Sequence, residues 1–557
     1  MTAPFEDLID LASERLGAAA VAANDEFFGF MDSLLKPTAP EWREGLPTFL
    51  CGGGATCDRS RAASRARPEA PHRLAFGAPM STDKLPTQQD DFPAWYVEVV
   101  RRAEMAEHGP AKGSMIIKPH GYAIWEHTQR ALDDRIKATG HENVYFPLLI
   151  PMSLLEREAD HVEGFAPQVA VVTHGGGEKL EEPLAIRPTS EALIWHTYSR
   201  WVQSYRDLPL LYNQWNNVLR WEMRTRLFLR TSEFLWQEGH TAHATSVEAM
   251  EEARRMLEVY REVAEDVLAI PVHTGRKTAA ERFPGADETL CIEGLMRDAK
   301  ALQCGTSHFL GQNFGRAYDV KFLNASGEQE HAWGTSWGFT TRMVGAVVMA
   351  HGDDAGLRLP PAVAPIQVVI VPIHRNDEER SSVIAVAEPL RARLAEAGIR
   401  VRLDDREQHR PGYKFAEWEV KGVPIRIELG PRDVAAGQAV LVSRLDGTKE
   451  AVSIDEVASG MAERLASIQR ALYDDAVAFR EANTHEITSF DAFATGVEER
   501  GGFWVGAWCG DAACEAEISA KTKASIRFLP FEPVDPGAPC IHCGKPGVDT
   551  ATWARAY

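Results

Sequence analysis

The sequence lacks any apolar run long enough to cross a membrane as a helix. Such a helix needs roughly 18 consecutive apolar residues, and no stretch of the 557 residues approaches that length. The apolar patch at residues 18–23 is too short for a secretion signal and follows acidic residues. We therefore expect a cytoplasmic protein without a membrane segment.

The chain also lacks an excess of positive charge. It carries 60 Lys and Arg against 80 Asp and Glu, for a formal net charge of −20. This balance excludes a protein that coats nucleic acid non-specifically through a wide basic face. It does not exclude the binding of one RNA through local arginines. A GxxxxGK loop is missing as well, so any nucleotide phosphates must be held in another way.

Cysteines are few, and only the last four form a pattern. Cys509 and Cys514 have four residues between them, Cys540 and Cys543 have two, and 25 residues separate the pairs. Two short pairs at this spacing are typical of a tetrahedral Zn²⁺ site with four thiolates. Because no open position is evident, we expect a structural zinc site. The alternative is a set of ordinary thiols, as expected for Cys51, Cys57, Cys291 and Cys304.

Composition and periodicity predict five consecutive regions. Residues 1–79 include a small, arginine-rich, aperiodic stretch and are expected to be disordered, or spurious because Met80 is the true first residue. An α+β domain, an antiparallel sheet with helices, is expected at 80–352, and a proline-rich linker at 353–365. An α/β domain at 366–470 and a small zinc-binding α+β domain at 471–557 follow.

Local patterns support this division. Helical periodicity marks "AIWEHTQRALDDRIKATG" and "VEAMEEARRMLEVYREVAEDVLAI", whereas "NVYFPLLIP" reads as a strand and "VKFLNASGEQEHAWGTSWGF" as antiparallel strands joined at a Ser-Gly turn. After the linker, "IQVVIVPI", a helix and "IRVRLDD" form a βαβ pattern, which predicts a parallel sheet.

The stretch at 218–243, "VLRWEMRTRLFLRTSEFLWQEGHTAH", crowds arginine, carboxylate and indole together. Read as a strand, "NVLRWEM" puts Arg220 and Glu222 on one face. "EFLWQEGH" puts Trp236, Glu238 and His240 on one face, next to Phe234. An arginine-rich loop joins the strands. A salt-bridged surface hairpin is the alternative reading.

Two further stretches favour a binding site. "RPTSEA" places Thr189 and Glu191 two residues apart, and "WGFTTR" places Arg342 at the start of an apolar helix. An arginine there opposes the helix dipole unless an anion binds nearby. Arginines suit phosphates, carboxylates suit an ammonium group, and aromatic rings suit a side chain. Together they predict a site for a nucleotide and a small zwitterion.

These residues resemble a known family. "VLRWE…FLRTSEFLWQEGH" is similar to motif 2 of class II aminoacyl-tRNA synthetases, and in particular of prolyl-tRNA synthetases. "RPTSE", "LQCGTSHFLGQNF", "WGFTTR" and "NVYFPLLIP" resemble the same family, and "PGYKFAEWEVKGVPIRIELGPRD" resembles its anticodon-binding domain. The match runs from Met80 to Tyr557.

The resemblance implies a proline–tRNA ligase that uses ATP with Mg²⁺, L-proline and tRNA(Pro), and that forms a homodimer. It implies that Arg220 contacts the α-phosphate of ATP and Arg342 the γ-phosphate, and that both are catalytic. The remaining ATP contacts would be Glu222, Arg230, Thr231, Gln303 and Thr306. The proline pocket would comprise Thr189, Glu191, Trp236, Glu238, His240 and His308.

The resemblance also covers the rest of the chain. It is to the archaeal and eukaryotic type with a carboxy-terminal zinc domain, and it implies anticodon contacts for Glu419, Arg426 and Arg432. In this family a final tyrosine carboxylate approaches the active site, a role that would fall to Tyr557.

Several alternatives stay open at this point. Glu222 either braces motif 2 or reads adenine, and Arg224 and Arg226 meet either the tRNA acceptor end or solvent. A catalytically silent paralogue, or a ligase for another carrier, would share parts of the pattern. About sixty residues separate His240 from Gln303; this is too few for an editing domain, so no editing in cis is expected.

Overall fold

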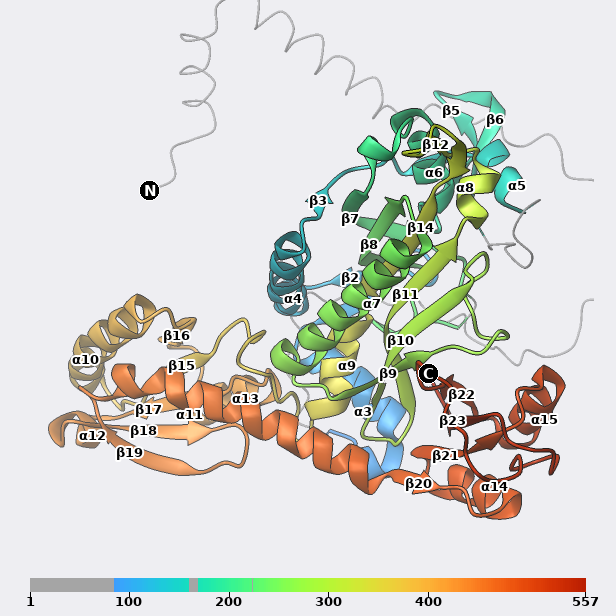
Figure 1. The fold of residues 1–557 in the computed structure, drawn as a ribbon. Helices are drawn as coiled ribbons and strands as arrows, with labels where there is room; N and C mark the ends of the chain where they lie inside the picture. Colours follow the sequence, from blue (N-terminus) through green and yellow to red (C-terminus); the bar gives the residue numbers. More distant parts are fainter. Residues whose placement is uncertain (1–84, 160–168, 223) are drawn as a thin grey trace, which may run out of the picture. The chain divides into compact units, whose positions relative to one another are not determined.

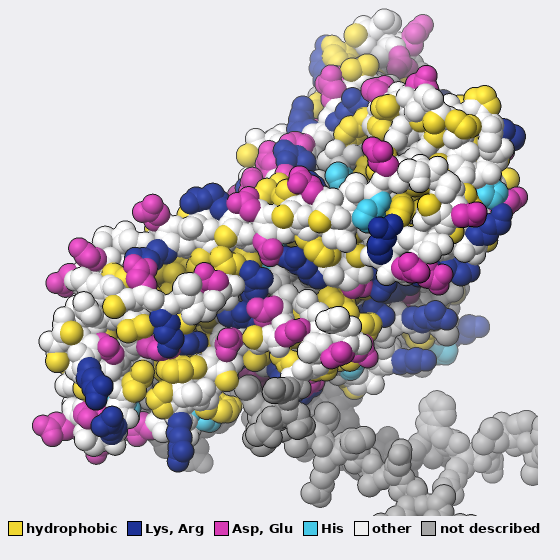
Figure 2. Space-filling model, turned by 90° about the horizontal axis from the view of Figure 1, so that it is seen from below, with side chains coloured by type: hydrophobic (Ala, Val, Ile, Leu, Met, Phe, Trp, Pro, Cys, Tyr) yellow, Lys and Arg dark blue, Asp and Glu magenta, His cyan; other side chains and the backbone are white. Residues whose placement is uncertain are grey.

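The computed structural model describes residues 85–159, 169–222 and 224–557. The predicted extension at 1–79 and the side chain of Met223 lie outside the described residues. No helix in the described part of the chain is long and apolar enough to cross a membrane. On the face drawn in Figure 2, Lys and Arg side chains are interspersed with Asp and Glu.

A seven-stranded sheet organises the first part of the described chain. Its strand order is β3-β7-β8-β14-β11-β10-β9, and every pairing is antiparallel except that of β3 with β7. The strands are β3 (Glu142–Asn143), β7 (Leu210–Leu219), β8 (Glu233–His243), β9 (Val272–Arg276), β10 (Glu288–Leu295), β11 (Ala301–Gly311) and β14 (Trp333–Thr340). The predicted antiparallel sheet is confirmed.

Helices cover this sheet and connect its strands. α7 begins with a capping box at Thr245 and Glu248 and packs along β8, β10, β11 and β14 (Figure 1). The helices are α3 (Gln88–Arg102), α4 (Pro119–Ala138), α5 (Met152–Ala159), α6 (Glu191–Trp201), α7 (Ser246–Glu262), α8 (Asn313–Ala317) and α9 (Arg342–His351), with short turns at η1 (Tyr205–Asp207) and η2 (Val263–Val267).

Smaller sheets surround the main one. β1 (Ala106–His108) pairs with β2 (Met115–Ile117), and β12 (Lys321–Leu323) pairs with β13 (Gln329–His331) around a turn at Gly327. A further sheet holds β4 (Leu149–Pro151), β5 (Val171–Gly175) and β6 (Glu178–Ile186). The pairing of β12 with β13 confirms the hairpin predicted after residue 320.

The single strand predicted at "NVYFPLLIP" is wrong. The chain forms β3, leaves the main sheet, and joins a different sheet as β4. Pro147 has no N–H for a ladder, and the backbone around Phe146 bonds instead to side chains. Its N–H donates to Gln214, and its carbonyl accepts from Arg187 Nη1 at 2.8 Å.

Glycines make room for indole rings in the centre of the main sheet. A Cβ at Gly239 of β8 would overlap the ring of Trp337, and one at Gly334 of β14 would overlap the ring of Trp195. Both rings are buried. The absence of a side chain at these two positions therefore sets how closely the rings pack on the strands.

A five-stranded sheet follows, with the order β16-β15-β17-β18-β19. β15 pairs in parallel with β16 and β17, as the βαβ pattern predicted, and β18 and β19 are antiparallel. The elements are β15 (Val368–Pro372), α10 (Asp377–Glu396), β16 (Val401–Leu403), α11 (Pro411–Val420), β17 (Ile425–Leu429), α12 (Pro431–Ala435), β18 (Gln438–Ser443) and β19 (Lys449–Ser453).

Two features differ from the predicted division into separate domains. Leu357, Leu359 and Val363, within the segment expected to be a linker, are buried in the same core as α9. The expected boundary at residue 470 falls inside α13 (Val457–Ala482), one continuous helix.

The last region is a small α+β unit. Its four-stranded sheet has the order β20-β21-β23-β22 and carries two helices. The elements are β20 (Thr484–Glu486), α14 (Phe490–Glu499), β21 (Phe503–Trp508), α15 (Ala512–Thr522), β22 (Ser525–Phe528) and β23 (Asp549–Ala554).

Candidate active site

A cavity of about 380 Å³ opens over β8, β11 and β14. Side chains that alternate along β8 point into it, because residues two apart in a strand share a face. It brings together all the residues predicted to bind ATP or proline: Thr189, Glu191, Arg220, Glu222, Arg230, Thr231, Trp236, Glu238, His240, Gln303, Thr306, His308 and Arg342.

One detail of the strand prediction is wrong. β7 ends at Leu219, so Arg220 and Glu222 do not reach the cavity by strand alternation, and Trp221 is 58% exposed. The backbone N–H of Arg220 donates to the carbonyl of Ser232 at 2.8 Å, which closes the base of the loop. The two side chains face the cavity from this loop.

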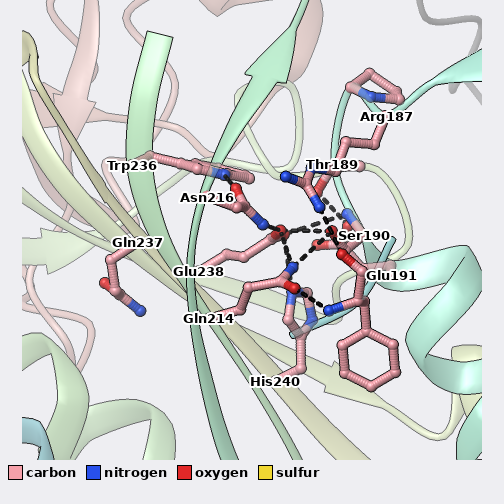
Figure 3. A network of polar contacts seen from close by, with 12 residues as sticks. Arg187, Thr189, Ser190, Glu191, Gln214, Asn216, Trp236, Gln237, Glu238 and His240 are labelled. Atoms are coloured by element: carbon pink, nitrogen blue, oxygen red, sulfur yellow. Dashed lines mark hydrogen bonds and ion pairs between the residues drawn. The ribbon is translucent and has the colours of Figure 1, made fainter. Parts of the chain in front are cut away.

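Glu238 is the centre of a buried network at one end of the cavity (Figure 3). It accepts hydrogen bonds from Ser190 Oγ and Asn216 Nδ2, and from Gln214 Nε2 at 3.1 Å. His240 Nε2 lies 3.0 Å from the carboxylate. Burial alone would raise the pKa of Glu238, but His240 and the hydrogen bonds from Ser190 and Asn216 outweigh it and lower the pKa to about 2.

His240 and Glu191 complete this end. Burial opposes protonation of His240, but the contact with Glu238 and the charge of Glu191 leave its pKa above the ordinary value. The hydroxyl of Thr189 donates to Glu191, the first residue of α6. A cavity end with two buried carboxylates suits a ligand that carries an ammonium group.

Arg220 and Arg342 bring positive charge to the same cavity. Arg220 Nε donates to the Pro188 carbonyl at 3.0 Å, and Arg342 Nε to the Leu229 carbonyl at 3.3 Å. Burial lowers the pKa of both guanidinium groups, and for Arg342 the charge of Arg220 adds to this effect. Within the described ranges neither makes an ion pair with a carboxylate, so both suit an anionic ligand.

The arginine-rich loop lies beside these groups. Arg230 Nε and Glu222 Oε2 form an ion pair at 3.1 Å. The guanidinium of Arg226 lies 5.8 Å from the ring centroid of Tyr557, whose hydroxyl donates to Asp298 at 2.7 Å. Tyr557 is not among the residues that line the cavity.

The cavity has one wall that sequence reasoning missed. Glu281, Arg282, Phe283 and Pro284 line it from the segment between β9 and β10. The Phe283 ring stacks on His308 with 4.5 Å between centroids. The only sequence signal was the Pro-Gly pair at 284–285 between two strands, which marks a turn.

The four patterned cysteines converge. The Sγ atoms of Cys509, Cys514, Cys540 and Cys543 all lie within 4.8 Å of one another. Cys514 Sγ and Cys540 Sγ are 3.7 Å apart, and Cys509 Sγ and Cys543 Sγ are 3.6 Å apart. Zn–S bonds of about 2.3 Å in a tetrahedron place sulfur atoms about 3.8 Å apart. The donor set and its spacing fit zinc.

A second cavity, of about 450 Å³, lies in the five-stranded region. Glu419 and Arg426 line it, together with the indole of Trp418, whereas Arg432 does not. Arg426 Nη2 pairs with Glu428 at 2.9 Å, and Lys449 Nζ pairs with the same carboxylate at 3.0 Å.

Comparisons with known proteins agree with this geometry. Residues 174–351 match the tRNA synthetase class II core domain (G, H, P, S and T), residues 367–464 the anticodon binding domain, and residues 490–557 the prolyl-tRNA synthetase C-terminal domain. A proline–tRNA ligase of Flavobacterium johnsoniae is 52% identical over 488 residues, or 85% of this chain and 99% of the relative. The chain belongs to the prolyl-tRNA synthetase family.

Other relatives support the same assignment. A proline–tRNA ligase of Chlorobium phaeobacteroides is 51% identical over 483 residues, covering 85% of this chain and all of the relative. Among solved structures, a prolyl-tRNA synthetase from Cryptosporidium parvum, complexed with halofuginone and AMPPNP, superposes with a TM-score of 0.82 at 38% identity. That match covers 85% of this chain and 99% of the other. The protein is therefore a class II aminoacyl-tRNA synthetase, and the predicted family and fold class are confirmed.

Proposed function

We propose that the protein activates L-proline with ATP to prolyl-adenylate and transfers the prolyl group to the 3′ end of tRNA(Pro). One observation carries this proposal: a single cavity joins two buried carboxylates, Glu191 and Glu238, to two arginines, Arg220 and Arg342, that have no carboxylate partner in the described chain. A zwitterion and a polyphosphate are complementary to those two ends.

The ATP side is assigned as follows. Arg220 contacts the α-phosphate and Arg342 the γ-phosphate, and both neutralise charge that develops as the bond to pyrophosphate breaks. Gln303 and Thr306 hold the ribose, while Arg230 and Thr231 hold the phosphate and adenine end. For Glu222, the ion pair with Arg230 supports a role in bracing the loop.

The proline side uses the anionic end. Glu191 and Glu238 attract the prolyl ammonium, and Thr189 and His240 hold those carboxylates in place. Trp236 and His308 form apolar walls for the pyrrolidine ring. Because the ammonium is anchored, the prolyl carboxylate is directed toward the α-phosphorus near Arg220.

The chemistry needs no protein nucleophile. A prolyl carboxylate oxygen attacks the α-phosphorus in line, a new P–O bond forms, and the bond to the pyrophosphate oxygen breaks. The terminal ribose hydroxyl of tRNA then attacks the adenylate carbonyl, and AMP leaves. Mg²⁺ bound with ATP would share the neutralisation of phosphate charge.

Two measurements on the pure protein test this function. Proline-dependent exchange of pyrophosphate into ATP is expected, followed by charging of tRNA(Pro) with proline. A silent paralogue would show neither activity, and a ligase for another carrier would show exchange without charging. Either result would refute the proposal.

The second cavity is proposed as the anticodon site. Glu419 and Arg426 line it beside an indole, and RNA bases that leave the stack are held by such rings and polar groups. A contact of Arg432 with the anticodon stays a prediction. The five predicted regions, with boundaries after residues 79, 352, 365 and 470, are proposed as the domain division.

We also propose that the chain does not edit misacylated tRNA in cis. Residues between His240 and Gln303 form the end of β8, α7, η2, β9, β10, the start of β11 and the segments that join them, including residues 277–287. Hydrolysis of alanyl-tRNA by the pure chain would contradict this. Pairing of two copies through the segment at residues 143–151 is also proposed, and a monomer in sedimentation at micromolar concentration would contradict that.

Zinc is proposed as a structural ion held by Cys509, Cys514, Cys540 and Cys543. Bound there, it would cross-link α15 to the segment before β23, because Cys514 and Cys540 belong to these parts. Cys540→Ser is expected to lower bound zinc from about one ion per chain and to lower the melting temperature, because zinc affinity contributes to folding. Cys304→Ser, outside the quartet, is the matched control. Full zinc occupancy in Cys540→Ser would contradict the assignment.

A further inference from the structure

The segment between β9 and β10, residues 277–287, forms one wall of the active-site cavity and is called the wall loop below. Its Phe283 stacks on His308, and the Phe283 N–H donates to Thr289 Oγ1 at 3.0 Å. Thr289 Oγ1 in turn lies 3.0 Å from His308 Nδ1. Because His308 belongs to the proposed proline pocket, the position of the wall loop shapes the amino-acid side of the cavity.

The start of the wall loop is attached to the small carboxy-terminal unit, where β22 lies beside β9 and β10 (Figure 1). The backbone of Arg276 exchanges two hydrogen bonds with Leu529, at 2.9 and 2.8 Å. Lys277 Nζ then donates to the carbonyl of Arg527 at 2.7 Å. Two consecutive residues that lead into the loop are thus bonded to a segment some 250 positions further along the chain.

A buried ion triad reinforces this attachment. Lys277 Nζ and Arg527 Nη2 both pair with Glu293 of β10, at 2.7 and 2.9 Å. The Glu293 side chain is fully buried, and the two cations are nearly so. Removing Glu293 would leave two buried cations without a counter-ion, so this carboxylate holds both cations in one arrangement.

A second attachment comes from the cysteine-bearing helix. The hydroxyl of Thr278 donates to Glu515 Oε1 at 3.0 Å, and both side chains are buried. Glu515 directly follows Cys514 on α15. Thr278 lies three residues before Glu281, the first cavity-lining residue of the wall loop.

We propose that the carboxy-terminal unit positions the wall loop through Thr278–Glu515 and Lys277–Glu293–Arg527, and thereby sets the affinity for the amino acid. Glu515 and Arg527 do not line the cavity, so they are positioning residues rather than catalytic ones. The wall loop lines the amino-acid side next to His308, so its displacement affects proline more than ATP. This inference rests on the proposed function of the cavity.

The test measures proline-dependent exchange for three variants of the full chain. Glu515→Ala and Thr278→Val are each expected to raise KM for proline about tenfold, the scale of one hydrogen bond to a charged group, with KM for ATP nearly unchanged. Glu515→Gln keeps an acceptor for the Thr278 hydroxyl and is expected to restore KM for proline. Glu498→Ala, an exposed residue of α14, is the control and should resemble the wild type.

Two further readouts separate positioning from a general loss of stability. Amides of residues 277–287 should exchange hydrogen faster in Glu515→Ala, while those of α7 exchange as in the wild type. The double variant Thr278→Val with Glu515→Ala should be no worse than either single variant, because both remove the same bond. If Glu515→Ala fails to fold, Thr278→Val carries the test alone.

The outcomes are distinct. A lower melting temperature with an unchanged KM for proline and unchanged exchange of the wall loop would overturn the proposal, as would additive effects in the double variant. If the wild type shows no proline-dependent exchange, the proposed function fails. Hydrogen exchange of residues 277–287 then still decides whether the carboxy-terminal unit holds the loop.

Discussion

The arginines of the two cavities described above differ in their charge partners. Arg220 and Arg342 donate to backbone carbonyls and make no ion pair with a carboxylate in the described chain. Arg426, in the second cavity, shares Glu428 with Lys449. A guanidinium without a carboxylate partner keeps its donors for an incoming anion, whereas a paired cation is already neutralised. This difference supports the proposal that the first cavity binds phosphate and the second binds groups of little net charge, such as bases.

The largest expected effect is at Arg220. Arg220→Ala should lower proline-dependent ATP–pyrophosphate exchange roughly 100-fold or more, because it removes a donor to charge that develops in the transition state. Exchange kinetics at saturating proline measure this. Arg224→Ala, an exposed arginine of the same loop, is the control and should retain exchange. If Arg220→Ala kept the wild-type rate of ATP–pyrophosphate exchange, the proposed difference between the two cavities would be wrong.

Arg426 should have a smaller and more selective effect. Arg426→Ala is expected to lower kcat/KM for tRNA charging about tenfold, on the scale of one base contact. Exchange without tRNA should be unchanged, because the second cavity is not needed for activation. Arg432→Ala, whose side chain does not line the cavity, should lower charging less. Equal losses in charging and exchange for Arg426→Ala would show that the two cavities do not act separately.

The smallest effect is expected at Lys449. Its pair with Glu428 is largely exposed on the lysine side, so Lys449→Ala should change the free energy of unfolding by less than about 1 kcal/mol. Urea unfolding measures this change. A loss of several kcal/mol would mean that the second cavity, like the first, depends on buried charge.

Sequence reasoning reached the parts whose signal is local. The alternation along residues 233–243 placed Trp236, Glu238 and His240 on one face, and Arg342 was expected at a helix start, as observed. The spacing of the four cysteines likewise predicted their convergence. In each case the period of a strand or helix, or a short spacing, fixed the geometry.

The errors and omissions arose where distant segments decide the local structure. The break at Pro147 depends on Gln214 and Arg187, and the end of β7 depends on Ser232. The wall loop was missed because its attachments to Glu515 and Arg527 span more than two hundred residues. Local propensity carries no information about such partners.

The packing of the β8–β14 centre restricts how the substrate range of the enzyme could be reprogrammed. A larger residue at Gly239 or Gly334 would collide with an indole ring, so neither position offers a route to a new pocket shape. The wall loop has no such restriction at Glu281, which is exposed. A laboratory search for variants that accept other amino acids should therefore find its tolerated substitutions in residues 281–284 rather than in the strands beneath them.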